Sequence, residues 1–302
     1  EFFGWEMDAQ GYSLDDMQVE QVRDLMEDNA NLAEHAQNKV SLVQMGMIHR
    51  LVLLSKHDIV KVKQNSARAS ALLSSTPRNH NNFVGSVLDA LIGLLQCEDE
   101  ETCRNTAATI ANIATNDEIS ARIGKLGGIF PLILLLKSSD SSCQGNACHA
   151  LSRLTTVGEN KLSTLSYNGI DFLIPLFVSK HDRVSVLATM VMCNLSSCSS
   201  HEHEFVREDL IRELGNIASG DCPVSSKYAI MSLCNLTSMC RVRDHVAREV
   251  DLTELFGWMN QESSNTERRV FSTMLVCNLS SVEKHRVEIL AAGGLGCLDN
   301  IA

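Results

Sequence analysis

The tetrapeptide Cys193-Asn194-Leu195-Ser196 returns almost unchanged as Cys234-Asn235-Leu236-Thr237 and as Cys277-Asn278-Leu279-Ser280. Weaker copies precede these at residues 70–73, 110–113 and 151–154. One column of this alignment holds residues 72, 112, 153, 194, 235 and 278, with spacings of 40, 41, 41, 41 and 43 residues. Such a period predicts stacked helical repeats that bury their apolar faces against one another. Because a stack leaves a long surface for a partner, the first functional expectation is a binding protein.

The composition of the 302 residues agrees with a helical stack. The chain has only 4 prolines, and its 14 aromatic residues are 2 Trp, 3 Tyr and 9 Phe. Helix-favouring residues dominate long periodic stretches, and no strand-like alternation stands out. A hydrophobic content of 44% is enough for a large core. The prediction is an all-α chain that forms one elongated domain over residues 1–302.

One repeat can be followed through residues 116–154, where Ile119 and Ile123 stand at helical spacing. The predicted segments are a first helix over 116–125, a break at Gly127-Gly128, an apolar second helix over 129–137, a polar capping loop over 138–142 and a third helix over 143–154. The same order recurs over 38–73, 160–195 and 242–279, and the two intervening units are less regular.

This three-helix order resembles the armadillo repeat family. The glycine-led second helix matches in Gly46-Met47-Ile48, Gly127-Gly128-Ile129, Gly169-Ile170-Asp171 and Gly293-Gly294-Leu295. The end of the third helix matches best in Val276-Cys277-Asn278-Leu279-Ser280. The resemblance implies a right-handed superhelical solenoid of about six three-helix repeats, with a concave groove lined by third helices. HEAT repeats are the structural rival, and the glycine break argues against them.

Charge separates the leading end from the rest of the chain. Residues 1–37 carry ten acidic side chains against Arg23, a net charge of −9 within a total of −11. We expect an acidic N-terminal cap over 1–37 with a degenerate repeat beginning at Asn31-Leu32. About six repeats are expected over 38–282, with a partial repeat over 283–302.

The repeated asparagines are the first candidate binding residues: Asn112, Asn194, Asn235 and Asn278. In the family that the chain resembles, the repeated Asn binds the backbone of a partner. A carboxamide offers a donor and an acceptor, which suits the paired N–H and C=O groups of an extended segment. The alternative is that these side chains only hydrogen-bond neighbouring helices.

One helical turn before this column stand Arg68, Ala108, His149, Met190, Met231 and Met274. Nuclear import adaptors of the family have Trp here, so a cargo receptor of that kind is disfavoured. Three methionines in register predict an adaptable apolar strip, since an unbranched thioether can repack around different side chains. The alternative is that they fill the core between helices.

The third helices carry more basic than acidic side chains. Six windows that end one residue past the column hold nine basic residues, including Arg68, Arg104, Arg153 and Lys227, against four acids near the helix starts. A groove lined by them would attract acidic amphipathic segments. The alternative is that several of the basic groups are solvated at the rim. The predicted partner-binding residues are Arg68, Arg104, Asn112, His149, Arg153, Met190, Asn194, Lys227, Met231, Asn235, Met274 and Asn278.

Other chemistry finds little support in the sequence. No Walker loop or His-Glu-x-x-His motif occurs, so we expect neither an enzyme nor a cofactor. The best metal candidate, Cys193, Cys198, His201 and His203, shares Cys193 with the repeated column and is disfavoured. Scattered basic residues in an acidic chain argue against nucleic acid.

Cysteine usage and hydropathy bear on location. The 11 cysteines include no C-x-x-C pair, which favours reduced thiols in a cytoplasmic or nuclear protein. No apolar run reaches the roughly 18 residues that cross a bilayer. The chain starts at Glu1, so we expect membrane contact only through an anchor outside it.

The resulting prediction is a monomeric, non-catalytic adaptor for other proteins. The resemblance extends to short membrane-docked adaptors made of armadillo repeats only, which implies that the chain tethers an organelle or a myosin motor. The alternatives are a nuclear transport receptor, a structural component of a cytoskeletal or axonemal assembly, and a module that regulates an appended enzyme.

Overall fold

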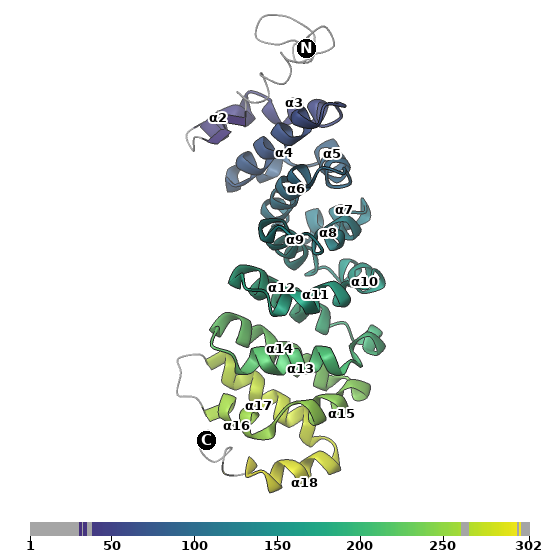
Figure 1. Ribbon diagram of the computed structural model, residues 1–302, viewed down its shortest axis with the longest axis vertical. Helices are drawn as coiled ribbons and strands as arrows, with labels where there is room; N and C mark the ends of the chain where they lie inside the picture. The colour runs from purple at the N-terminus through teal and green to yellow at the C-terminus, as the bar shows by residue number, and fades with distance from the viewer. Residues whose placement is uncertain (1–29, 32, 35–37, 261–265, 295, 297–302) are drawn as a thin grey trace, which may run out of the picture. The chain divides into compact units, whose positions relative to one another are not determined.

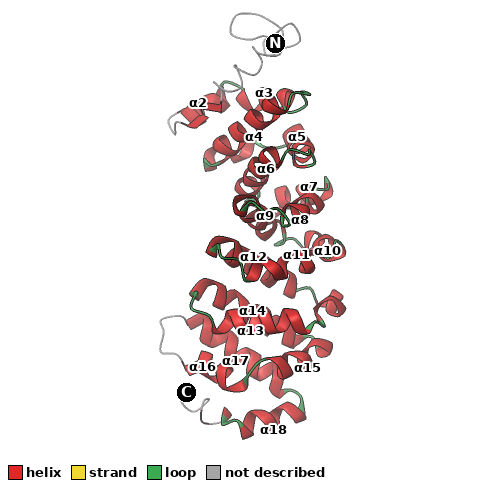
Figure 2. Cartoon of the chain, in the orientation of Figure 1, coloured by secondary structure: helices red, strands yellow, loops and turns green. Residues whose placement is uncertain are grey.

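The computed structural model describes residues 30–31, 33–34, 38–260, 266–294 and 296. Two compact units divide the chain, Glu1–Asn160 (unit 1) and Lys161–Ala302 (unit 2). Helices alternate with short turns in both units, and the described residues contain no strand (Figure 2). The all-α prediction is confirmed. Most of the predicted acidic cap over 1–37 lies outside the described residues.

Unit 1 contains three repeats of three short elements each. They are α2 (Asn38–Gln44), α3 (Met47–Leu54) and α4 (Val60–Ser74); η2 (Pro77–Asn82), α5 (Ser86–Leu95) and α6 (Glu100–Ile113); and α7 (Asp117–Lys125), α8 (Ile129–Leu135) and α9 (Ser141–Leu154). The third helices stack in sequence order, because α4 packs on α6 and α6 packs on α9 (Figure 1). This stack brings residues about 40 positions apart in the chain to equivalent places.

Unit 2 repeats the arrangement, and the boundary between the units falls inside α10. Its elements are α10 (Gly158–Ser166), α11 (Gly169–Phe177) and α12 (Asp182–Ser196); η3 (Ser199–Phe205), α13 (Glu208–Ser219) and α14 (Pro223–Ser238); α15 (Cys240–Glu249), α16 (Leu252–Asn260) and α17 (Thr266–Ser280); and α18 (Glu283–Ala291). Here α12 packs on α14 and α14 on α17. The last helix, α18, begins the predicted partial repeat.

The two irregular repeats share one departure from the pattern. Their first helix is replaced by a 3₁₀ segment, η2 in unit 1 and η3 in unit 2. Phe83 follows η2 directly and Phe205 ends η3, and both side chains are 0% exposed. Burial of a Phe side chain contributes about 1.5–3 kcal/mol. A buried aromatic side chain therefore helps to hold each 3₁₀ element against its unit, and in η2 Asn79 Nδ2 also donates to the carbonyls of Lys39 (3.2 Å) and Leu73 (2.9 Å).

The break between first and second helices has two requirements. In repeat three Gly127 takes a positive φ of 86°, and a Cβ on Gly128 would lie 2.8 Å from Cγ2 of Ile123. The first position needs a left-handed backbone and the second needs the absence of a side chain. In repeat four Asn168 supplies the left-handed residue with φ of 55°. The break expected at Gly169 thus begins one residue earlier, since Asn tolerates this conformation.

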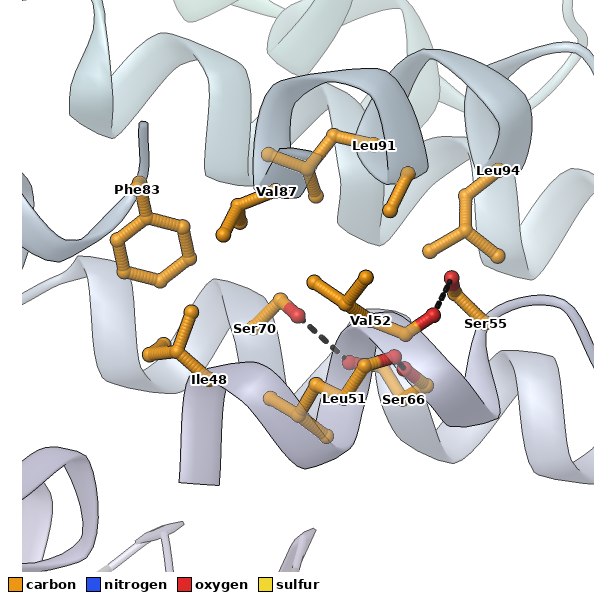
Figure 3. Close-up of a pocket in the computed structure, with 11 residues that line it drawn as sticks. Ile48, Leu51, Val52, Ser55, Ser66, Ser70, Phe83, Val87, Leu91 and Leu94 are labelled. Carbon is orange, nitrogen blue, oxygen red and sulfur yellow. Dashed lines mark hydrogen bonds between the residues drawn. The ribbon is translucent and has the colours of Figure 1, made fainter. Parts of the chain in front are cut away.

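The interior between the helices of unit 1 is closely filled. Figure 3 shows the space between α3, α4 and α5, where Ser66 Oγ donates to the carbonyl of Leu51 (3.0 Å) and Ser70 Oγ to that of Ser66 (2.8 Å). Apolar side chains line the rest, including Phe83 and Leu91. The remaining cavity of about 10 Å³ is at the lower limit for one water molecule. This cavity is too small for a segment of a partner protein.

Candidate functional site

One strip of each third helix stays open to solvent. In α14, Met231 and Asn235 lie one turn apart and are half-buried, whereas Ile230, Leu233 and Leu236 are 0% exposed. The equivalent residues of the other third helices are likewise half-buried or exposed. We call this strip the ladder face; it comprises Arg68, Leu72, Ala108, Asn112, His149 and Arg153 in unit 1, and Met190, Asn194, Met231, Asn235, Met274 and Asn278 in unit 2.

The ladder asparagines contact the preceding third helix. Asn112 Nδ2 donates to Ser74 Oγ (3.1 Å) and Asn235 Nδ2 to Ser196 Oγ (3.0 Å). Asn278 Nδ2 donates to Thr237 Oγ1 at 3.2 Å and also to the carbonyl of Cys234 at 3.1 Å. No described group donates to the carboxamide oxygens of these three side chains. Each carboxamide thus joins two repeats and keeps an acceptor for another molecule.

The hydroxyl partners are themselves hydrogen-bonded in two directions. Ser196 Oγ donates to the carbonyl of Cys193 (2.8 Å), and Thr237 Oγ1 to that of Cys234 (2.8 Å). Each hydroxyl therefore donates within its own helix and accepts from the next repeat. One repeat position needs an Asn and the position two residues later needs Ser or Thr, which accounts for the recurring Asn-Leu-Ser/Thr triplet.

Sequence reasoning missed this hydroxyl, although the chain contains a second indication of it. The column residue of the third repeat is Arg153, not Asn. In the repeat before it, the position that holds Ser74 or Ser196 elsewhere is Ala114. The Asn donor of α9 and the hydroxyl acceptor at the end of α6 are thus both absent where these two helices pack.

Several predicted basic residues of the ladder region are already paired with acids. Arg68 forms an ion pair with Glu34, Arg104 with Asp140 (3.1 Å) and Lys227 with Glu267 (2.5 Å). The basic surplus counted on the sequence therefore overstates the charge that a ligand meets at these three positions.

Two pKa values follow these contacts. The Ser142 amide, together with Arg104, holds the pKa of Asp140 below its ordinary value, and the hydrogen bond to Glu267 raises that of Lys227. Arg153, by contrast, is exposed and makes no ion pair with a described residue. It is the basic side chain of the ladder face that a ligand can reach without displacing an acid.

The three ladder methionines differ from the core methionines. Met192 and Met259 are 0% and Met239 2% exposed. Met190 and Met231 are half-buried, and Met274 is 47% exposed. The ladder methionines of unit 2 are therefore more exposed than the methionines of the core.

The cysteines of this region lie mostly in the core. Cys193 and Cys234 are buried, and burial raises the pKa of each thiol to about 11. Cys198 contacts Ser200, and the rings of His201 and His203 stack with centroids 5.8 Å apart. Over the part of the chain that the structure describes, no three His, Cys, Asp or Glu side chains gather as metal ligands would.

Comparison with known sequences identifies one recurrent family. The model of the Armadillo/beta-catenin-like repeat matches residues 84–115, which include all of α5 and α6. Armadillo repeat-containing protein 3 of Homo sapiens is 29% identical over 178 residues, 55% of this chain and 19% of that protein. Vacuolar protein 8 of Saccharomyces cerevisiae is 28% identical over 164 residues, 53% of this chain and 28% of that protein. The chain spans less than a third of the length of either relative.

Solved structures support the same architecture. An engineered protein superimposes with a TM-score of 0.84 at 22% identity, covering 95% of this chain and 71% of that one. A designed armadillo repeat protein in complex with the peptide (KR)4 gives a TM-score of 0.67 at 16% identity, covering 76% of this chain and 98% of that one. At these identities the likeness concerns the fold alone. None of the described helices has the length and apolar content needed to cross a bilayer.

Proposed function

This chain belongs to the armadillo-repeat family and has the all-α solenoid fold of that family, and on this premise we propose that it is a non-catalytic scaffold that binds an extended segment of a partner protein along the ladder face. The observation that carries the proposal is the open carboxamide oxygen of Asn112, Asn235 and Asn278 beside half-buried or exposed side chains. Within unit 2, Asn235 and Asn278 lie on the packed helices α14 and α17, and two such acceptors at one repeat position suit the N–H groups of an extended backbone.

In unit 2 the ladder face is apolar beside its amides. Met231 and Met274 stand one turn before Asn235 and Asn278, so each helix offers a thioether beside an amide. Apolar side chains of the bound segment would pack on the thioethers while its backbone meets the amides. Because a thioether adapts to several shapes, the ladder face of unit 2 should accept apolar ligand residues in general rather than one particular residue type.

In unit 1 the ladder face is more polar and carries basic side chains. Arg153 is exposed there, and the ion pairs of Arg68 and Arg104 are at the surface, where such pairs contribute only about 0–1 kcal/mol each. An acidic residue of the ligand could exchange for Glu34 or Asp140 at small cost. We therefore propose a preference for acidic amphipathic segments, opposite to the (KR)4 peptide of the designed armadillo protein.

Attachment to an organelle is part of the same proposal. The relative named Vacuolar protein 8 carries the name of an organelle, which is the support for this part of the proposal: the chain is held at a membrane while its ladder face binds a partner. Binding of the purified chain to vesicles of anionic lipid, compared with binding of a chain supplied with an N-terminal acyl group, would test that role.

The binding proposal is tested with three labelled peptides. One alternates Glu with Leu, the second replaces each Glu with Lys, and the third is (Lys-Arg)4. Fluorescence anisotropy should give the tightest binding for the Glu-Leu peptide, and added salt should weaken it. The double variant Met231→Ala, Met274→Ala should bind the Glu-Leu peptide about tenfold more weakly, equivalent to ~1.4 kcal/mol.

A matched control is available in Met45, which is 67% exposed and lies outside the third helices. Met45→Ala removes the same side chain from the surface and should leave the affinity unchanged. Equal losses in the control and in the double variant, or preferential binding of (Lys-Arg)4, would refute the proposed site or its charge preference.

A further inference from the structure

The turn between α5 and α6 brings two thiols into contact. Cys97 follows the end of α5, Cys103 lies in the first turns of α6, and their Sγ atoms are 3.8 Å apart. No other two described cysteines make a sulfur–sulfur contact, and all ten described cysteines are free. A disulfide bond is about 2.05 Å long, so a movement of roughly 2 Å would join the pair.

The two thiols have unequal surroundings. Cys103 is 4% exposed, and its Sγ faces the carbonyls of Leu94 (3.7 Å), Leu95 (3.4 Å) and Cys97 (3.2 Å). The carbonyls of Leu94 and Leu95 belong to the end of α5, where the helix dipole disfavours a negative charge. Burial and the neighbouring Cys97 raise the pKa of the Cys103 thiol far above its ordinary range. Cys97 is half-buried and so is the thiol that solvent reaches first.

We propose that Cys97 and Cys103 form a redox site that a peroxide oxidises to an intramolecular disulfide. The Cys97 thiol first loses its proton, and the thiolate attacks one oxygen of hydrogen peroxide; the S–O bond forms, the O–O bond breaks, and the hydroxide that leaves combines with the released proton to give water. The sulfur of Cys103 then attacks the Cys97 sulfenic acid. The S–S bond forms, the S–O bond breaks, and the hydroxyl leaves as water with the proton of Cys103. Two thiols are oxidised and one peroxide is reduced to two waters.

Oxidation would alter the start of α6. Cys103 loses the proton that it directs at the carbonyls of α5, so the last turn of α5 loses a donor. Between the two cysteines lies Asp99, which caps α6 by accepting from the Thr102 amide (2.8 Å) and accepts from Gln64 of α4 (3.0 Å). Oxidation of the pair would therefore alter the position of Asp99 and with it the hydrogen bond between Gln64 of α4 and the cap of α6. This inference does not depend on the proposed binding function.

The test uses the full chain, reduced and then exposed to limited hydrogen peroxide. Remaining thiols are alkylated and the protein is digested with trypsin, which leaves both cysteines in the peptide 79–104, between Arg78 and Arg104. The expected product is this peptide without alkyl groups and lighter by two hydrogens. A second digestion after glutamate cuts at Glu98, Glu100 and Glu101, and the two fragments that contain cysteine, 79–98 and 102–104, should stay joined until a reductant is added.

Variants distinguish this pair from general oxidation. Cys97→Ser and Cys103→Ser should each abolish the linked product. The hydroxyl introduced by Cys103→Ser would still donate to the α5 carbonyls, so the fold is kept. Cys240→Ser removes an exposed cysteine of unit 2 and should leave the linked product unchanged. The proposal is overturned if the exposed cysteines 222, 240 and 277 have reacted while peptide 79–104 still carries two alkyl groups, or if Cys97 accumulates as a sulfinic acid without the link.

Discussion

Units 1 and 2 stack their third helices in the same way but differ in what those helices expose. At the position one turn before the column, unit 1 has Arg68, Ala108 and His149, whereas unit 2 has methionine each time. The contacts beneath the surface are alike, because Asn112 and Asn235 both donate to a serine of the preceding helix. The backbone register is therefore set by one group of residues and the surface chemistry by another. A partner could be changed in one unit without loss of the stack.

The largest expected change in unfolding free energy tests whether the 3₁₀ segments of units 1 and 2 are held in the same way. Phe83→Ala in unit 1 and Phe205→Ala in unit 2 each remove a fully buried anchor of a 3₁₀ segment. Each should cost about 3–5 kcal/mol of unfolding free energy, because the cavity cannot collapse. Urea denaturation of the two variants measures this. A cost below about 1 kcal/mol for only one of them would break the equivalence of the units.

Smaller effects are expected at the second position of the helix break. A Cβ on Gly169 would meet the backbone oxygen of Thr164 at 2.7 Å, whereas on Gly128 the nearest atoms, at 2.8 and 2.9 Å, are methyl ends of Ile123 and Ile92. Gly→Ala at either site should destabilise by about 1–3 kcal/mol, with the greater cost at 169, since backbone yields less than side chains. Thermal unfolding gives the order.

The control for this pair is Gly93, inside α5, where an added Cβ meets nothing within 4 Å. Gly93→Ala should stabilise the protein by about 0.4–1 kcal/mol. A gain in stability at Gly128 as well would contradict the close approach described for the helix break.

The ladder hydrogen bonds are expected to contribute equally in both units. Double-mutant cycles on Asn112 with Ser74, and on Asn235 with Ser196, should each give a coupling of about 0.5–1.5 kcal/mol in unfolding free energy. Chemical denaturation of each single and double variant provides the four terms. Coupling in one unit alone would mean that the asparagines have different structural roles in the two units.

The smallest effect concerns acid and should separate the units. In unit 1 Asp99 and Asp140 cap α6 and α9, whereas α12 and α14 of unit 2 have no side-chain cap. The Ser142 amide and Arg104 hold the pKa of Asp140 below its ordinary value of 3.8. The contribution of ionised Asp140 to the unfolding free energy is fully present above pH 3.8, the ordinary pKa of the group. It is lost as the pH falls through the lower pKa that Asp140 has in the folded protein.

The measurement is an NMR titration of the Thr102 and Ser142 amides, which donate to these two carboxylates. Their shifts should change with midpoints below 3.8. The first-turn amides of α14 should show no such change from a cap. A midpoint above this value at Ser142 would contradict the cap geometry.

Much of the scaffold could be predicted from the sequence because its period is local and repeated. The helix break at Gly127-Gly128 and the capping loop before α9 are found where periodicity and turn chemistry place them. The sequence indicates two less regular repeats but does not predict their 3₁₀ segments. No local pattern distinguishes a 3₁₀ segment beside a buried Phe from an ordinary first helix. The local pattern thus predicts the regular α-helices better than the 3₁₀ segments that take their place.

The chemistry of the ladder face was harder to predict. The ion pairs of Arg68, Arg104 and Lys227 join residues 34 to 40 positions apart, so a charge count over one helix cannot reveal them. The serine or threonine hydroxyl that accepts from each ladder Asn is equally distant in the sequence, so a single helix cannot reveal it either. Both depend on how one repeat is placed against the next, which only the stack determines.

The bond from Asn to hydroxyl has a consequence for how such a chain can lengthen. A copied repeat brings an Asn for the helix before it and a Ser or Thr for the helix after it, so a duplicate can be inserted beside its original with both junctions already matched. The junction of Ala114 and Arg153 has lost both groups. A duplicate of the third repeat would carry that Arg to a new junction, whereas a duplicate of the fifth, with Asn235 and Thr237, could extend the stack without further change.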